Sequence, residues 1–340
     1  MTQKRVKWLQ ICLEQTGETV EINKLDKYLS DMQYFDLHRH YINRIEEEDT
    51  QMKTNYSGGR PVIAFIVLLS ALLSLAGCAL RPEQAAKALT VSLLRVGKAD
   101  AIILLSDSCA MLIDAGEEDD GQEIMDFLRE KGVGEIEAMI VTHYDQDHVG
   151  GADTVLEQIP VKKVYAPAYE GTGQEYRDFV DAAEAAAVPV YRLEEPVSFP
   201  FSDAEVLIEP PRSYEVGDSD EETDNNFSLI TTVRHGEDRL VFMGDAEKQR
   251  IRQWLEDSRP EPCDFLKVPH HGVYNKALEE LLGALSPKYA VVCSSRKNPA
   301  EEKTMEMLKQ YCPNVYQTKD GDVTVVSSGT GVEAGQDTKH

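Results

Sequence analysis

Residues 142–151 read THYDQDHVGG and place two histidines and two aspartates within six positions: His143, Asp145, Asp147 and His148. Imidazole and carboxylate groups are the usual protein ligands of Zn²⁺, Mn²⁺ and iron. The segment ends an apolar run, IEAMIVTH, that is typical of a β-strand. The spacing therefore predicts a metal site at the C-terminal end of a strand, in preference to a solvated acidic loop.

Four more polar residues occupy similar places after predicted strands. Asp114 follows an apolar strand in LIDAG, Asp245 follows one in FMGDA, and His270 and His271 follow one in KVPHHG. A carboxylate at the end of a buried strand is costly unless a cation or hydrogen-bond donors compensate it. A cap or turn role explains one such aspartate, but metal coordination explains the whole set.

The elements that must position these residues are strands and helices within residues 90–328. Short apolar runs typical of strands come first as a meander, and amphipathic stretches such as QEIMDFLREKG and EKQRIRQWLED then separate the later ones. This order predicts one layered α/β domain of the α+β kind, with its sheets covered by helices. The polar residues 329–340 are predicted to be a disordered tail.

The motifs HxDxDHxGG, GDA and KVPHHG, in that order, resemble those of the metallo-β-lactamase fold hydrolases, and most of all their ComEC-like branch. The resemblance covers about residues 90–328 and implies an αββα sandwich with a metal site where the edges of two sheets meet. It also implies one or two divalent metal ions, Zn²⁺ or Mn²⁺, and a metal-bound hydroxide as the nucleophile.

The resemblance implies six metal ligands: His143 and Asp145 for a first ion, Asp147, His148 and His270 for a second, and Asp245 as the bridge. Asp147 would also orient the attacking hydroxide, and His271 would be an alternative ligand or a proton donor to the leaving group. Asp145 stands where the commonest family pattern has a histidine. The first ion would therefore gain an oxygen ligand, which shifts preference toward harder ions such as Mn²⁺.

Other residues are expected around the metal ligands. Asp114 would accept hydrogen bonds from ligands and so orient them. The segment TDNNFSLI resembles an Asn-rich segment of the same branch, so Asn225, Asn226 and Ser228 are candidates for contacts with the substrate or with ligands. A role confined to a loop turn is the alternative for each of these three residues.

The charge balance bears on the substrate. The chain has 60 acidic and 35 basic residues, a net charge of −25. Nucleic-acid binders usually carry the opposite sign, so a long nucleic acid is disfavoured, although metal ions can supply local positive charge. We expect a phosphoester or phosphodiester substrate. A lactone or other small ester, or a non-catalytic binding protein on the same fold, are the alternatives.

The segment before residue 81 has a different character. Residues 61–80 carry no charge, follow Lys53 and Arg60, and contain LAGC, which resembles the lipobox of bacterial lipoprotein signal peptides. That resemblance implies lipidation of Cys78 at the extracytoplasmic face of the cell membrane, and an uncleaved signal-anchor helix is the alternative. The segments are interpreted as follows: 1–51, an extension from a misassigned start or a cytoplasmic segment; 52–80, the signal peptide or anchor; 81–89, a tether.

Overall fold

The computed structural model describes residues 87–107, 109–214 and 224–337, which belong to one compact unit, Gln84–His340. The predicted extension, the signal peptide or anchor with Cys78, and most of the predicted tether lie outside the described residues. Within the described residues, no helix is both long and apolar enough to cross a membrane.

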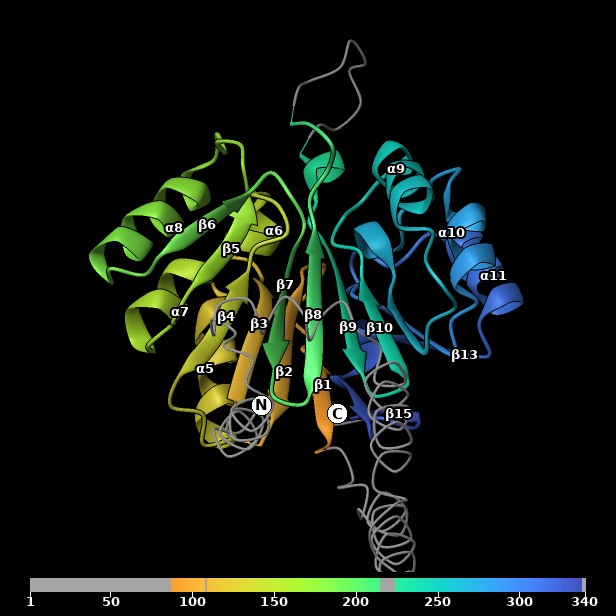
Figure 1. Cartoon of the computed structure of the whole chain (residues 1–340), viewed down its shortest axis with the longest axis horizontal. Helices are drawn as coiled ribbons and strands as arrows, with labels where there is room; N and C mark the ends of the chain where they lie inside the picture. The colour runs from red at the N-terminus through yellow and green to blue at the C-terminus, as the bar shows by residue number, and fades with distance from the viewer. Residues whose placement is uncertain (1–86, 108, 215–223, 338–340) are drawn as a thin grey trace, which may run out of the picture. The chain divides into compact units, whose positions relative to one another are not determined.

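The described residues form two β-sheets (Figure 1). The first has the strand order β15-β14-β1-β2-β3-β4-β5-β6 and the second β13-β12-β11-β10-β9-β8-β7. The strands of the first sheet are β1 (Leu89–Leu93), β2 (Ala101–Ser106), β3 (Cys109–Ala115), β4 (Ile136–Ile140), β5 (Val164–Pro167), β6 (Val190–Leu193), β14 (Val323–Ser327) and β15 (Val332–Gln336). Those of the second are β7 (Val197–Phe201), β8 (Ala204–Glu209), β9 (Ile230–His235), β10 (Asp238–Phe242), β11 (Phe265–Lys267), β12 (Tyr289–Val292) and β13 (Asn314–Gln317).

Helices flank the sheets on both sides, as Figure 1 shows. Those beside the first sheet are α5 (Asp120–Glu130), α6 (Gln146–Val149), α7 (Ala152–Gln158) and α8 (Gln174–Ala185). Those beside the second are α9 (Lys248–Ser258), α10 (Leu278–Leu285) and α11 (Glu302–Tyr311). Three short 3-10 turns are η1 (Asn225–Phe227), η2 (Pro269–Gly272) and η3 (Thr318–Asp320).

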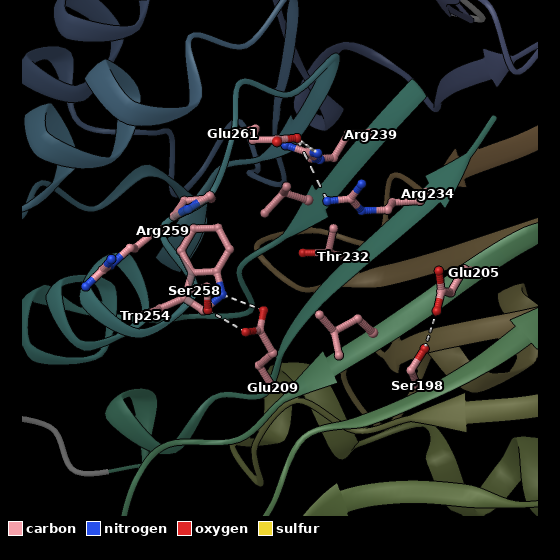
Figure 2. Close-up of a pocket in the computed structure, with 13 residues that line it drawn as sticks. Ser198, Glu205, Glu209, Thr232, Arg234, Arg239, Trp254, Ser258, Arg259 and Glu261 are labelled. Atoms are coloured by element: carbon pink, nitrogen blue, oxygen red, sulfur yellow. Dashed lines mark hydrogen bonds and ion pairs between the residues drawn. The ribbon is translucent and has the colours of Figure 1, made fainter. Parts of the chain in front are cut away.

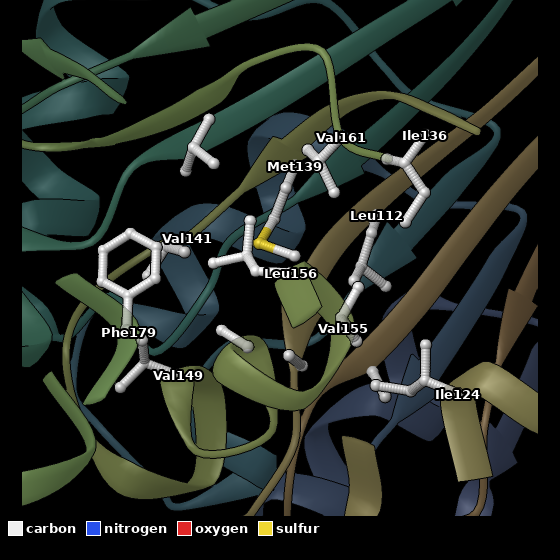
Figure 3. Packing of buried hydrophobic residues seen from close by; sticks show 14 of the residues in the cluster. Leu112, Ile124, Ile136, Met139, Val141, Val149, Val155, Leu156, Val161 and Phe179 are labelled. Atoms are coloured by element: carbon white, nitrogen blue, oxygen red, sulfur yellow. The ribbon is translucent and has the colours of Figure 1, made fainter. Parts of the chain in front are cut away.

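Three hydrophobic clusters correspond to the three interfaces of this sandwich. One joins the first sheet to its helices (Figure 3), one lies between the sheets, and one joins the second sheet to its helices. Strand β3 shows the period of two behind this division, because Met111 and Ile113 face the other sheet while Leu112 faces the helices. Each such buried side chain stabilises the fold by about 1.5–3 kcal/mol. The predicted αββα sandwich is confirmed.

The C-terminal region differs from our expectation in its last strand. Residues 332–336, predicted to be disordered, form β15, whose backbone pairs with β14 in an antiparallel ladder. Strands β13 and β14 are neighbours in the sequence but belong to different sheets, since β13 pairs with β12 and β14 with β1. The backbone turns between them at Gly321, whose φ of 146° is accessible to glycine. The polar composition of the tail predicts disorder, but hydrogen bonds between main-chain groups of β14 and β15 stabilise a strand there.

The C-terminal ends of several strands meet at one edge of the sandwich. β3 and β4 run parallel in the first sheet, and β10, β11 and β12 run parallel in the second. Parallel neighbours deliver the residues that follow them to the same edge. Asp114, His143, Asp245 and the two histidines of η2 all lie at or directly after such ends.

Candidate metal centre

Three buried histidines, His143, His148 and His271, converge at this edge of the sandwich. The Nε2 atoms of His148 and His271 are 3.2 Å apart, and the rings of His143 and His148 lie 4.1 Å apart between centroids. All three side chains are almost completely buried. Imidazoles brought this close in a dry environment need protons or a metal ion between their inward-facing nitrogens.

The outer nitrogen of each ring, Nδ1, is held by a hydrogen-bond acceptor. The three pairs are His143 with Thr142 Oγ1 at 3.0 Å, His148 with Asp114 Oδ2 at 2.8 Å, and His271 with the Cys293 carbonyl oxygen at 3.0 Å. The hydroxyl of Thr142 donates to Asp114 at 2.7 Å, which leaves its oxygen able to accept from His143. An acceptor on Nδ1 fixes the proton there and leaves the lone pair on Nε2, as metal-binding histidines require.

Three carboxylates face these Nε2 atoms. Asp245 lies 3.2 Å from His148 through Oδ1 and 3.1 Å from His271 through Oδ2, so it spans two histidines. Asp147 lies 3.3 Å from His271, and Asp145 lies 3.5 Å from His143. His143 Nε2 is buried and has no hydrogen-bond partner among the described residues. The donor set, imidazole nitrogens with carboxylate oxygens, fits Zn²⁺ or Mn²⁺.

Electrostatics agree with a cation site. Burial disfavours charge on His148, but the carboxylates of Asp245 and Asp114 outweigh it and raise the pKa of His148 well above 6.5. Burial likewise opposes ionisation of Asp245, yet His271, His148 and Lys267 lower the pKa of Asp245 well below its usual range. The carboxylates therefore hold protons on His148 and His271 when no metal is present, and a metal ion would displace those protons.

A family model for the metallo-beta-lactamase superfamily matches residues 94–296. The chain belongs to this superfamily. Its members are generally hydrolases that bind divalent metals, and the histidine and aspartate groups described above are candidate sites for such ions. The predicted family is thereby confirmed.

The chain is 27% identical over 200 residues to ComE operon protein 3 of Bacillus subtilis, which covers 57% of this chain and 25% of that protein. It is 27% identical over 236 residues to recombination protein 2 of Haemophilus influenzae, with 67% and 27% covered. The matched regions thus span about a quarter of these relatives. The metallo-beta-lactamase fold protein YhfI of Bacillus subtilis superposes with a TM-score of 0.43 at 8% identity, covering 67% of this chain and 95% of that one.

His271, and not His270, occupies the place predicted to complete the second metal site in this superfamily member. The two residues have left-handed backbones, with φ of 49° and 50°, and their rings diverge, with planes 69° apart and centroids separated by 6.4 Å. His270 Nδ1 lies 3.1 Å from Glu247 Oε1 instead. The assignment of His270 as a ligand is therefore corrected, and a proton-donor role for His271 conflicts with its place inside the ligand cluster.

The remaining predicted residues lie around this cluster. Asp114 Oδ2 lies 2.8 Å from His148 Nδ1, and the φ of Asp114, 57°, is an unusual value for a residue other than glycine. Ser228 Oγ accepts a hydrogen bond from the Asp245 backbone N–H at 3.2 Å, so it positions a ligand. Asn226 accepts the backbone N–H of Arg250 near the start of α9. These contacts give Ser228 a place in the site and Asn226 a place in the scaffold.

Asn225 lies at the margin of the centre. Its Nδ2 atom is 3.5 Å from His270 Nε2, and its side chain is buried. Asn225 and His270 therefore form a pair on the side of the cluster where Glu247 also lies.

Sequence reasoning missed a buried ion pair behind the ligands, formed by Lys267 and Asp100. Lys267 is fully buried, and its ammonium also lies 3.4 Å from Asp245 Oδ1 and donates to the Gly244 carbonyl at 3.0 Å. Burial disfavours charge on Lys267, but Asp100 and Asp245 outweigh it and raise its pKa. The alternation of side chains along a strand indicates this burial. In FLK of β11, Phe265 faces the other sheet, and Lys267, two positions later, must face it as well.

Two glycines permit close packing beside His148. A Cβ atom on Gly150 would come within 2.6 Å of the Glu118 backbone nitrogen, and one on Gly151 within 2.5 Å of the Ala115 carbonyl oxygen. Both have ordinary right-handed φ values, so close approach and not backbone conformation requires glycine here. The acidic loop 117–120 consequently packs against the segment that follows His148.

Proposed function

We propose that this chain is a divalent-metal-dependent hydrolase of phosphoester bonds, with a phosphodiester as the preferred class. The observation that carries the proposal is the convergence of three imidazole Nε2 atoms, each on a ring whose Nδ1 is held by an acceptor, with the carboxylates of Asp147 and Asp245. A bound divalent ion supplies Lewis acidity and lowers the pKa of coordinated water. A carboxylate-rich set favours hard ions, which also bind phosphate oxygens well.

Asp147 and His270 are the residues that we assign to positioning water and to proton transfer. Asp147 is partly exposed, with 21% of its side chain accessible, so its carboxylate can both face the cluster and accept a hydrogen bond from water. His270 lies at the margin with Glu247 against its Nδ1. His270 is a histidine next to the cluster but outside it, and we assign it the role of proton donor to a leaving group.

Hydrolysis of bis(p-nitrophenyl) phosphate, with metal analysis of the purified protein, tests the proposal. We expect stoichiometric metal and activity that falls by about 100-fold or more in Asp147→Ala, because a ligand and water-orienting group is lost. Asp181→Ala, at an exposed aspartate on α8, is the matched control and should keep both properties. Absence of metal, or an unchanged rate in Asp147→Ala, would contradict the proposal.

A panel of lactones and carboxylic esters assayed in parallel separates the substrate classes. Metal-dependent hydrolysis of a lactone without hydrolysis of any phosphoester would retain the metal centre and replace the proposed substrate. A protein that binds metal and hydrolyses neither class would support a binding function on the same fold.

We propose further that Cys78 anchors the protein to the extracytoplasmic face of the membrane, on the strength of the apolar run and LAGC in residues 61–80. Mass spectrometry of the mature N-terminus should find a lipid on Cys78, and Cys78→Ser should release the protein from the membrane fraction. A mature chain that retains residues 52–77 and stays membrane-bound as Cys78→Ser would favour the signal-anchor alternative.

A further inference from the structure

Two surface cavities among the described residues have opposite properties. The first, of about 380 Å³, lies over the outer face of β7–β10 beside the end of α9 (Figure 2). Several of its charged groups are already paired with neighbouring side chains. Glu209 accepts from Trp254 Nε1 at 2.7 Å and from Ser258, and Arg239 pairs with Glu261. Such a cavity leaves few charged or hydrogen-bonding groups free to bind a ligand.

The second cavity, of about 320 Å³, is lined by Arg95, Gly97, Ser294, Ser295, Arg296 and Lys319. Three of these six residues are cationic and none is acidic, in a chain whose net charge is −25. The concentration of positive charge in one hollow therefore runs against the composition of the molecule.

The protein itself uses only part of the hydrogen-bonding capacity of this second cavity: Ser295 Oγ accepts the Asn298 backbone N–H at 2.9 Å, and the Asp322 carboxylate accepts the Arg95 backbone N–H at 2.7 Å. Within the described parts of the chain, no carboxylate lies within ion-pair distance of the side chains of Arg95, Arg296 or Lys319. Ser294 is completely buried, and its Oγ has no hydrogen-bond partner there either. A buried hydroxyl left unpaired costs about 1–3 kcal/mol, so an occupant that accepts its hydrogen bond would be favoured.

The segments that line the cavity also carry residues that contact the metal centre. Ser294 follows Cys293, whose carbonyl oxygen holds His271 Nδ1 at 3.0 Å. Gly97 lies in the loop that ends at Asp100, the partner of the buried Lys267. β12, which precedes Ser294, runs parallel to β11, which precedes His271, so both residues emerge at the same edge of the sandwich.

We propose that this second cavity binds a phosphate group. Guanidinium groups match phosphate oxygens with paired N–H donors, a lysine adds a point charge, and Ser294 adds a buried hydroxyl donor. The phosphate is either one that a substrate carries next to the bond being cleaved or free inorganic phosphate. The first source rests on the proposed function, whereas binding of phosphate itself does not.

Two charge-matched double variants test the cavity. Arg296→Glu with Lys319→Glu reverses two of its cations, and Lys297→Glu with Lys309→Glu makes the same change in net charge at exposed lysines that do not line it. Equilibrium binding of inorganic phosphate and of a 5′-phosphorylated thymidine dinucleotide is measured by calorimetry on the full chain. We expect the cavity variant to weaken binding of at least one of them by about 10-fold or more, and the control by less than 3-fold.

Steady-state kinetics then distinguish the two sources. If the cavity holds a second phosphate of the substrate, the cavity variant raises KM for the dinucleotide about 10-fold and leaves kcat, and KM for bis(p-nitrophenyl) phosphate, within 2-fold. Weaker inorganic phosphate binding with unchanged dinucleotide KM assigns the cavity to free phosphate. Equal behaviour of both double variants in binding overturns the proposal. Loss of hydrolysis in every protein with binding still cavity-dependent would overturn only the proposed function.

Discussion

The two halves of the metal centre differ in how firmly their ligands are held. The deep half consists of Asp147, His148 and His271, and the open half consists of His143 and Asp145. In the deep half His148 is held by the buried carboxylate of Asp114 and His271 by a backbone carbonyl. In the open half Asp145 is 44% exposed and reaches His143 only at 3.5 Å. Asp245 lies on the deep side, between two histidines.

This difference indicates an order of metal affinity. Ligands whose orientation is fixed before binding lose less conformational freedom when the ion arrives, so the deep half should fill first. The open half has one imidazole and one exposed carboxylate, and Asp145 stands where a second imidazole would otherwise lie. We expect a first ion to bind tightly in the deep half and a second to bind weakly, if at all, in the open half.

The largest effect should come from the two adjacent histidines. His271→Ala removes a deep-half ligand and should lower metal affinity by at least about 100-fold, more than loss of an outer contact does. His270→Ala should keep the metal and lose about 10²-fold or more in kcat, because it removes a proton donor. Metal content by mass spectrometry and the kinetics of both variants check this. Metal loss in His270→Ala alone would reverse the assignment.

The deep half also depends on the buried ion pair behind it. Lys267→Met leaves Asp100 charged and unpaired in the interior, which should destabilise the fold by about 3–5 kcal/mol. Asp100→Asn combined with Lys267→Met removes both charges and should recover a large part of that loss. Urea unfolding of the metal-free proteins gives the two free energies. If the double variant is no more stable than Lys267→Met, the stability lost in Lys267→Met does not come from leaving Asp100 unpaired.

A third prediction concerns the acceptor that orients His148. Asp114→Asn keeps the size of the side chain and removes its negative charge, so His148 Nδ1 loses a charged partner. Metal affinity should fall about 10- to 100-fold with the fold intact. Thr154→Ser, a small change on α7 at a residue that is not among the candidate ligands, is a control that should leave the affinity unchanged. Competition with a zinc chelator measures both values.

The open half can be tested by adding the imidazole that it lacks. Asp145→His should strengthen binding of a second zinc ion by about 10-fold and leave the first unchanged, since imidazole is a better ligand than carboxylate for zinc. Titration with limiting zinc, followed by calorimetry, resolves the two events. An increase in the affinity of the first ion would show that the two halves are not separate in the way we infer.

The smallest effect is a pH dependence of the metal-free fold. Burial opposes charge on His148 and His271, but nearby carboxylates outweigh it and raise the pKa of both above 6.5. Their protonation therefore stabilises the metal-free fold fully below pH 6.5, and this contribution is lost as pH rises through the folded-state pKa values. Tm measured from pH 6 to 9 should fall without metal and fall less with it. A metal-free Tm that rises over this range would contradict the sign.

Much of the fold was predictable because most elements carry strong local patterns. Apolar runs in β1–β5, and amphipathic stretches in α5, α8 and α9, locate the sheets and helices without knowledge of their neighbours. The exceptions are elements stabilised by context. β15 is polar and exists through pairing with β14, and β7 contains Pro200, which a strand tolerates at the edge of a sheet.

The sequence by itself determined the family, the layered architecture and the gathering of acidic and imidazole groups at strand ends. It could do so because motif order and strand polarity are local properties. Tertiary structure alone decided which of two adjacent histidines enters the cluster, since two left-handed residues send neighbouring side chains in different directions. It alone also paired Lys267 with Asp100, which are 167 positions apart, because their partnership follows from the packing of one sheet on the other.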